Sequence, residues 1–180
     1  MYINFKKLNL GVPFLQSDLD ITNIKKLSIF SSLLILNPSL INLISRLGLK
    51  TDVTVLLYYP GSISTSGIHI DDDGILDQTN LNFVIDNGAA MTNWYNPVIG
   101  YSGDTAKNIL ARTRSYDINK LTLIESINTT GEGLFQAGVP HNVSNISSDR
   151  WCFSIKLRTL ENKVVKWEDS IRIFEKFIMN

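Results

Sequence analysis

Two histidines, His69 and His141, are the only imidazoles in the 180-residue sequence. His69 opens the triplet His69-Ile70-Asp71, and His141 lies much later, in an apolar stretch punctuated by Gly and Pro. Two imidazoles and one carboxylate are the ligands of the facial triad, which holds non-haem Fe(II) on one side and leaves the other side open. These residue types therefore indicate a metal site suited to oxygen chemistry, although Mn, Co, Ni and Zn bind similar ligands.

The spacing within the triplet matters because alternate residues of a β-strand face the same side. On a strand, His69 and Asp71 would point together, and His141 would join them from a neighbouring strand. The alternative is a coincidence within an acidic turn, because Asp72 and Asp73 follow at once. Such a run would be a solvated loop or an oxygen-rich cation site, but it lacks the ligand spacing of an EF-hand loop.

The first fifty residues carry helical signals and are expected to form a helical flank, 1–50. Asn37 and Pro38 mark a helix start, because Asn is a favoured cap and Pro is tolerated in the first turn. Apolar residues then recur at helical spacing until Gly48 ends the run. This helix should lay one apolar stripe on a sheet.

From residue 51 the apolar period changes to two, and turn clusters separate short segments, a pattern typical of strands. Eight such strands favour a sandwich or barrel, and the jelly roll is the eight-stranded member of that group. We therefore expect a mainly β single domain, 1–180, with its core over 51–158. The predicted strands are 51–58, Gly67–Asp71, Leu81–Ile85, Met91–Tyr95, Leu121–Ile127, Gly133–Phe135, Val139–Val143 and Trp151–Leu157.

Two further segments flank or interrupt the strands. The stretch 96–120 is long, polar and weakly periodic, and connections of this length are usually functional lids or disordered segments. A C-terminal helix is predicted over 167–178, with Asp169 or Ser170 as its cap and an apolar stripe on one face.

The arrangement of these residues resembles the Fe(II)/2-oxoglutarate-dependent dioxygenases, in particular the prolyl- and aspartyl-hydroxylase-like members. Their pattern is His-x-Asp, a distal His and then a basic residue, which His69, Asp71, His141 and Arg150 match. The stretch from Gly138 to Lys156 resembles the last two core strands of that family, and the resemblance covers residues 51–158. It implies a double-stranded β-helix (jelly roll) with flanking N- and C-terminal helices.

The resemblance assigns Arg150 to the distal carboxylate of 2-oxoglutarate, since a guanidinium binds a carboxylate through two parallel hydrogen bonds. The alternative is a surface arginine paired with Asp149. Many family members carry Ser or Thr two residues after the arginine, where this chain has Cys152. Further cosubstrate contacts are therefore expected from three other residues, Tyr58, Asn82 and Ser154.

Four residues are weaker candidates for a place near the substrate. Trp94 and Tyr95 could line the mouth of the site, although aromatic residues on strands more often pack in the core. Arg112 and Arg114 lie within the long connection and could contact an anionic substrate, or could belong to a solvated loop.

Taken together, the resemblance implies a hydroxylase that uses Fe(II), 2-oxoglutarate and O2, and that releases succinate. Two alternatives remain open. One is a cupin-like metal protein (an isomerase, a hydrolase or an oxygenase independent of 2-oxoglutarate), and the other is a non-catalytic jelly-roll binding module. The substrate is not identified, because one scaffold of this kind serves many substrates. A small molecule or a protein side chain is favoured.

The bulk composition limits the partners. Seventeen basic and 17 acidic residues cancel, so no long-range field attracts nucleic acid or an anionic membrane. The single cysteine, Cys152, fits a reducing compartment. No targeting signal is recognised, and the most apolar window, Leu27–Leu36, is about half of what a bilayer crossing needs. We therefore expect a cytoplasmic protein without a membrane partner.

Overall fold

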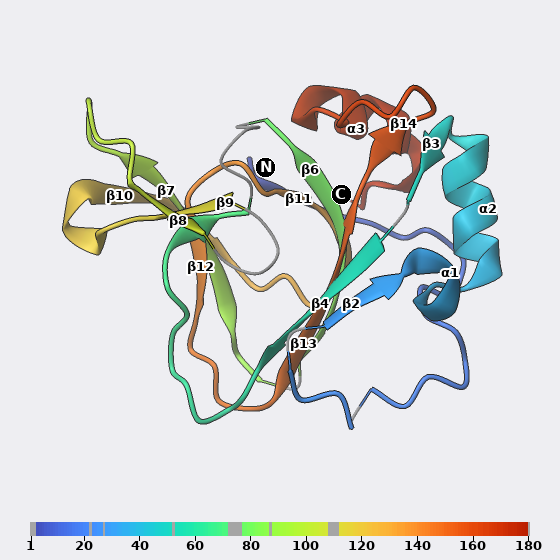
Figure 1. Ribbon diagram of the computed structural model, residues 1–180, viewed down its shortest axis with the longest axis horizontal. Coiled ribbons are helices and arrows are strands. Elements are labelled where there is room, and N and C mark those ends of the chain that lie inside the picture. The colour runs from blue at the N-terminus through green and yellow to red at the C-terminus, as the bar shows by residue number, and fades with distance from the viewer. Residues whose placement is uncertain are drawn as a thin grey trace.

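The computed structural model describes residues 3–179 except 22, 27, 52, 72–76, 87 and 108–111, and it leaves the side chains of 105–107, 112 and 113 undescribed. Within these limits the protein is mainly β, with two six-stranded antiparallel sheets (Figure 1). The first sheet has the order β1 (Phe5–Lys7), β11 (Gly131–Gln136), β6 (Thr79–Asp86), β13 (Arg150–Lys156), β4 (Val53–Tyr59) and β2 (Ser28–Ser31). The second sheet has the order β10 (Leu121–Ile127), β7 (Met91–Pro97), β12 (His141–Ser144), β5 (His69–Ile70), β9 (Arg112–Ser115) and β8 (Asp104–Lys107).

The remaining elements are short. A two-stranded ladder joins β3 (Leu49–Lys50) to β14 (Arg158–Thr159). The helices are α1 (Ser32–Ile35), α2 (Pro38–Arg46) and α3 (Trp167–Phe174), with 3-10 turns η1 (Ile118–Lys120) and η2 (Glu175–Phe177). In the described part of the chain, no helix has the length and apolar character needed to span a membrane.

The chain moves back and forth between the two sheets. It passes from β4 in the first sheet to β5 in the second, then to β6 and β7 in the same alternating way. After β10 it alternates again through β11, β12 and β13. All eight strands expected from the sequence are therefore present, and they contribute four to each sheet.

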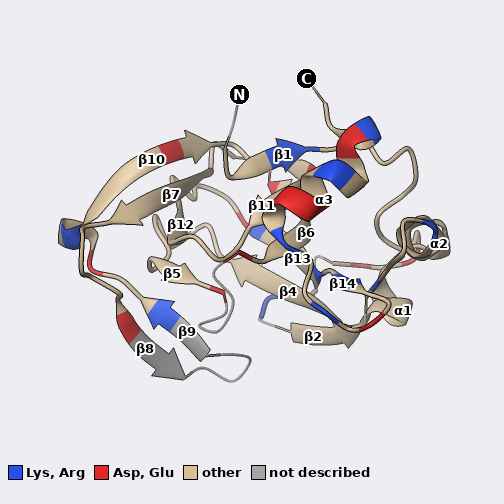
Figure 2. Cartoon of the chain, turned by 90° about the horizontal axis from the view of Figure 1, so that it is seen from above, with Lys and Arg blue, Asp and Glu red and all other residues tan. Residues whose placement is uncertain are grey.

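Strand β13 has two chemically different faces. Trp151, Phe153 and Ile155 belong to the larger apolar core, which also takes in residues of α1, α2 and α3. The alternate residues Arg150, Cys152 and Ser154 line a cavity on the opposite face. The helices thus cover the outer face of the first sheet (Figure 2). The polar side chains of β13 lie on the opposite face, which lines the cavity.

The helix start at residue 37 is confirmed. The Asn37 side chain accepts a hydrogen bond from the Ser39 N–H at 2.9 Å, and Pro38 is the first helical residue. Leu40 and Ile44 are buried against the first sheet. The expected cap of α3 is wrong, because the helix starts at Trp167 with Lys166 at the cap position and no side-chain cap.

Two regions contain strands that the sequence patterns did not indicate. The N-terminal flank is not wholly helical, since β1 and β2 extend the two edges of the first sheet. The segment 96–120 contains β8 and β9, which pair with each other and continue the second sheet beyond β5. Residues 108–111 of that segment lie outside the described residues. These edge strands are short, so their apolar alternation has too few residues to be recognised.

Candidate metal centre

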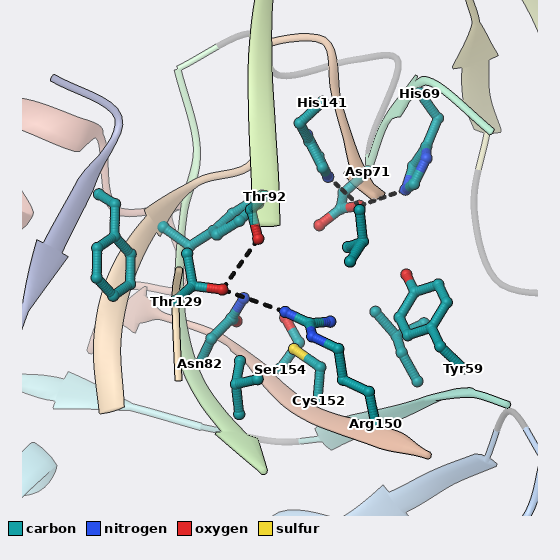
Figure 3. A pocket seen from close by; sticks show the side chains of 15 residues that line it. Tyr59, His69, Asp71, Asn82, Thr92, Thr129, His141, Arg150, Cys152 and Ser154 are labelled. Carbon is teal, nitrogen blue, oxygen red and sulfur yellow. Dashed lines mark hydrogen bonds and ion pairs between the residues drawn. The ribbon is translucent and has the colours of Figure 1, made fainter. Parts of the chain in front are cut away.

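Three side chains that are far apart in sequence meet at one end of the space between the sheets (Figure 3). The Nε2 atoms of His69 and His141 lie 3.4 Å and 3.6 Å from the same Asp71 oxygen, Oδ1. His69 and His141 stand opposite each other on the neighbouring strands β5 and β12. One ligand atom from each of the three residues lies within 4.8 Å of the other two, which suits a single metal ion.

Backbone carbonyls determine which nitrogen of each ring is free. His69 Nδ1 lies 2.9 Å from the Gly67 carbonyl, and His141 Nδ1 lies 2.8 Å from the Val139 carbonyl. A carbonyl oxygen only accepts, so each Nδ1 must carry a hydrogen and donate it. In the neutral rings the Nε2 lone pairs are then directed at the centre, which is the tautomer that a metal ligand requires.

A neighbouring amide orients the carboxylate. Asn80 Nδ2 donates to Asp71 Oδ2 at 2.9 Å, which leaves Oδ1 to face the two imidazoles. Burial by itself would raise the pKa of Asp71, but the contacts with His141 and His69 outweigh it and hold the pKa well below its usual range. Burial would lower the pKa of His69, and here the Asp71 carboxylate and the Gly67 carbonyl outweigh that effect and raise it.

The three residues differ in exposure. The His141 side chain is 7% exposed, whereas the side chains of His69 and Asp71 are 29% and 22% exposed. One side of the triad is therefore enclosed by the sheets and the other is accessible. This is the arrangement needed if a bound metal is to keep open coordination positions.

The enclosed side leads into a narrow cavity between the two sheets, with a volume of about 30 Å³. Its apolar lining includes Phe5 and Phe135 from the first sheet and Val143 from the second. Its polar lining is concentrated around Arg150, at the opposite end from the triad (Figure 3). The cavity thus has the His–Asp–His triad at one end and the Arg150 guanidinium at the other.

Arg150 is buried, with 3% exposure, and it does not pair with Asp149 as the surface alternative would require. Asp149 instead accepts from the Gly61 N–H and forms an ion pair with Lys25. Arg150 Nη2 donates to Thr129 Oγ1 at 3.1 Å, and its Nε lies 3.9 Å from Asp86 Oδ2 without forming a hydrogen bond. Among the described residues, neither that Nε nor that Oδ2 has a hydrogen-bond partner.

Of the three further cosubstrate residues expected from the sequence, Asn82 and Ser154 line the cavity and Tyr58 does not. Tyr58 lies on the other face of β4, where its ring contacts Trp151 with the centroids 5.5 Å apart. The prediction for Tyr58 is wrong because successive residues of a strand face opposite sides. The neighbouring Tyr59 is therefore the residue that lines the cavity.

The four candidates for the substrate side are scattered. Trp94 is fully buried and packs on Phe135, with its Nε1 donating to the Gln136 carbonyl. Tyr95 points to the outer face of the second sheet and donates to Asn142 Oδ1. Arg114 donates to the Ser102 carbonyl and is not among the residues that line the cavity. The side chain of Arg112 lies outside the described part of the structure.

Sequence reasoning missed Thr92, Thr129 and Asp86 as neighbours of Arg150. Thr92 Oγ1 and Thr129 Oγ1 are 2.9 Å apart, and both residues line the cavity. Their approach to Arg150 depends on strand pairing between segments far apart in the sequence, so no local pattern could reveal it.

The sequence matches no protein-family model, and no curated protein is significantly similar to it. The function is therefore inferred from the geometry of the site.

Proposed function

We propose that the protein is an Fe(II)- and 2-oxoglutarate-dependent dioxygenase that hydroxylates a C–H bond. The observation that carries this proposal is the convergence of three acceptor atoms, His69 Nε2, His141 Nε2 and Asp71 Oδ1. Lone pairs directed at one point repel each other unless a proton or a cation lies between them. Because the Nδ1 hydrogens are donated to carbonyls, the neutral rings turn their Nε2 lone pairs towards Asp71 Oδ1, and a divalent cation at the centre would bind all three atoms.

We further propose a double-stranded β-helix. A jelly roll has eight strands in two Greek keys. The order β11-β6-β13-β4 in one sheet and β10-β7-β12-β5 in the other divides the eight strands in this manner. Strands β1, β2, β8 and β9 would then be additions at the edges of the two sheets.

The donor set fits both groups that the proposal requires. His69, Asp71 and His141 would hold Fe(II), and Arg150, whose Nε is buried without a hydrogen-bond partner, would hold the distal carboxylate of 2-oxoglutarate. When bound, iron and 2-oxoglutarate supply the oxidation of the substrate by O2, with release of succinate and CO2. The protein's own residues hold and orient these groups, and the apolar lining excludes water.

The substrate belongs to this proposal only as a class. The accessible side of His69 and Asp71 is where a substrate would approach. A small molecule or a protein side chain is favoured, and the expected cytoplasmic location stays a prediction.

A second candidate is a cupin-like metal protein that does not use 2-oxoglutarate. It is favoured by Asp86, because this buried carboxylate already gives the Arg150 guanidinium a counterion inside the protein. In that case Arg150 and Asp86 would form a structural ion pair, and only the metal end of the cavity would have a function.

The proposal can be tested by metal binding and by succinate formation. Metal-free protein should bind one equivalent of Co(II), a redox-stable probe, in a calorimetric titration, and His141→Ala should abolish this binding. Asn93→Ala is a matched control, because Asn93 is a buried amide on the outer side of the second sheet. Fe(II)-loaded wild type should then convert 2-oxoglutarate to succinate and CO2 under air with ascorbate present, because ascorbate supplies the two electrons that the unidentified substrate would otherwise provide.

Two results would contradict the proposal in different ways. Metal binding without succinate formation would favour the cupin-like candidate. If neither Co(II) nor Fe(II) binds, both candidates fail and a non-catalytic module remains.

A further inference from the structure

The side chain of residue 152 is a poor hydrogen-bond donor for a bound carboxylate. Cys152 lies two residues after Arg150 on the same strand and lines the cavity. Burial raises the pKa of its thiol to about 11, Arg150 lowers the pKa by less, and Asp71 adds a further small increase. The thiol therefore stays neutral, and an S–H group is a weak donor compared with a hydroxyl.

Two hydroxyls approach Arg150 from the other side of the cavity. Thr129 lies in the turn between β10 and β11, with Asn128 Oδ1 accepting the Thr130 N–H and Gly131 adopting a φ of 90°. This tight turn crosses from the second sheet to the first and places Thr129 Oγ1 3.1 Å from Arg150 Nη2. Thr92, on β7 of the second sheet, lies behind it.

The hydroxyls of Thr92 and Thr129 together have one hydrogen that is not used in a hydrogen bond between them. Each hydroxyl has one hydrogen, and the Thr92–Thr129 contact at 2.9 Å uses only one of the two. Thr129 also accepts the hydrogen of Arg150 Nη2, so it is already an acceptor. Among the described residues no further partner takes the second hydroxyl hydrogen, although Thr92 and Thr129 are only 1% and 3% exposed.

We infer that Thr129, supported by Thr92, is the hydroxyl donor that completes the anchor for the distal carboxylate of 2-oxoglutarate. This inference rests on the proposed function. Thr92 donates to Thr129, Thr129 donates to one carboxylate oxygen, and Arg150 donates to the carboxylate from its side. Thr129 is then a binding residue, and Thr92 is a positioning residue that sets the direction of the Thr129 hydroxyl.

The test compares two 2-oxo acids that differ only at the distal end. Both 2-oxoglutarate and 2-oxopentanoate can chelate a metal through the 2-oxo acid group, but 2-oxopentanoate ends in a methyl group. Their affinities for the Fe(II)-loaded protein are measured by anaerobic calorimetry. Removal of one hydrogen bond to a charged group by Thr129→Val should weaken 2-oxoglutarate roughly 10- to 100-fold. The affinity for 2-oxopentanoate should not change.

Three further variants make the result specific. Thr129→Ser keeps the hydroxyl and should retain the wild-type preference for 2-oxoglutarate, and it serves if Thr129→Val does not fold. Thr92→Val should weaken 2-oxoglutarate less than Thr129→Val, because it removes only the supporting hydrogen bond. Arg150→Met should lose the preference altogether.

The outcomes separate this inference from the proposed function. If wild type prefers 2-oxoglutarate and Thr129→Val keeps that preference in full, the inference is wrong and the proposed function stands. If Thr129→Val weakens both acids equally, the residue shapes the cavity in general and the inference is also wrong. If wild type binds neither acid, the proposed function fails and the inference fails with it.

Discussion

Each histidine of the triad is oriented by the carbonyl two residues before it, Gly67 for His69 and Val139 for His141. The same local arrangement therefore occurs on both strands and leaves both Nε2 atoms free. Two residue types, His and Asp, were enough to predict the triad, because the chain contains no other histidine. The carbonyl partners could not be predicted, because they depend on the backbone path before each strand.

The neighbourhood of Arg150 shows the limit of prediction at this scale. A pairing with Asp149 was considered because the two are adjacent in sequence. The structure places Arg150 beside Asp86 and Thr129 instead, through strand pairing and a tight turn. A local sequence pattern records neighbours along the chain, whereas this environment is built from three separate segments.

The Asn80 amide should be needed for tight metal binding. Asn80→Ala removes the hydrogen bond that fixes Asp71 Oδ2, so the carboxylate can rotate away from the imidazoles. Loss of such an outer partner typically reduces metal affinity about 10- to 100-fold. Co(II) titration of Asn80→Ala would check this, with Asn93→Ala as the control for loss of a buried amide. Equal affinities in Asn80→Ala and wild type would show that the Asn80 contact is unimportant.

Cys152 should make the protein less stable in alkali. The folded pKa of about 11 is above the ordinary thiol value, so its stabilising contribution is complete below pH 8 and is lost as pH rises towards 11. At pH 10 the loss should be about 1 to 2 kcal/mol relative to pH 7. Urea unfolding of wild type and Cys152→Ala at both pH values measures it. An identical pH dependence in the two proteins would contradict this assignment.

At the scale of elements, the strands with clear turn signals were predicted well. The predicted Leu121–Ile127 coincides with β10, and the other seven core strands differ from their predictions mainly at the ends. Strand β1 was missed, although it forms one edge of the first sheet and brings Phe5 into the cavity lining. Its three residues are too few to show an apolar period. Its position depends on pairing with β11 and on the Glu125 carboxylate, which accepts hydrogen bonds from the N–H groups of Ile3 and Asn4.

The packing of β1 requires a glycine on its partner strand. A Cβ added at Gly133 would lie 2.3 Å from the Phe5 ring, closer than any van der Waals contact allows. Gly133→Ala should therefore cost about 1 to 3 kcal/mol and loosen β1. Hydrogen exchange of residues 3–8 and urea unfolding would measure these effects.

A second substitution tests the cause of that loss. Phe5→Leu removes the ring atoms that clash most closely, so Gly133→Ala should cost less in the Phe5→Leu background, with the contact to the Lys6 carbonyl oxygen at 2.9 Å remaining. If the two substitutions are simply additive, the ring contact is not what makes glycine necessary at position 133.

At the scale of the whole molecule, the numbers of basic and acidic residues are equal, and residues of both signs are distributed over the surface. Basic and acidic residues both occur on the surface elements, and α3 carries both signs (Figure 2). We therefore predict weak binding to duplex DNA, with a Kd of about 10⁻⁴ M or weaker at physiological salt. Fluorescence anisotropy with a labelled duplex would measure it. Tight binding that decreases steeply with salt would indicate a basic surface and would reopen nucleic acid as a partner.

The most direct test of the account is an anaerobic titration of metal-free protein with Fe(II) and then 2-oxoglutarate, followed by visible absorption. A 2-oxo acid chelated to Fe(II) gives a charge-transfer band, which should appear in wild type and be absent in His141→Ala. Arg150→Ala should need far more 2-oxoglutarate to reach the same absorbance. If wild type binds iron but gives no band at any concentration of 2-oxoglutarate, the dioxygenase assignment is wrong.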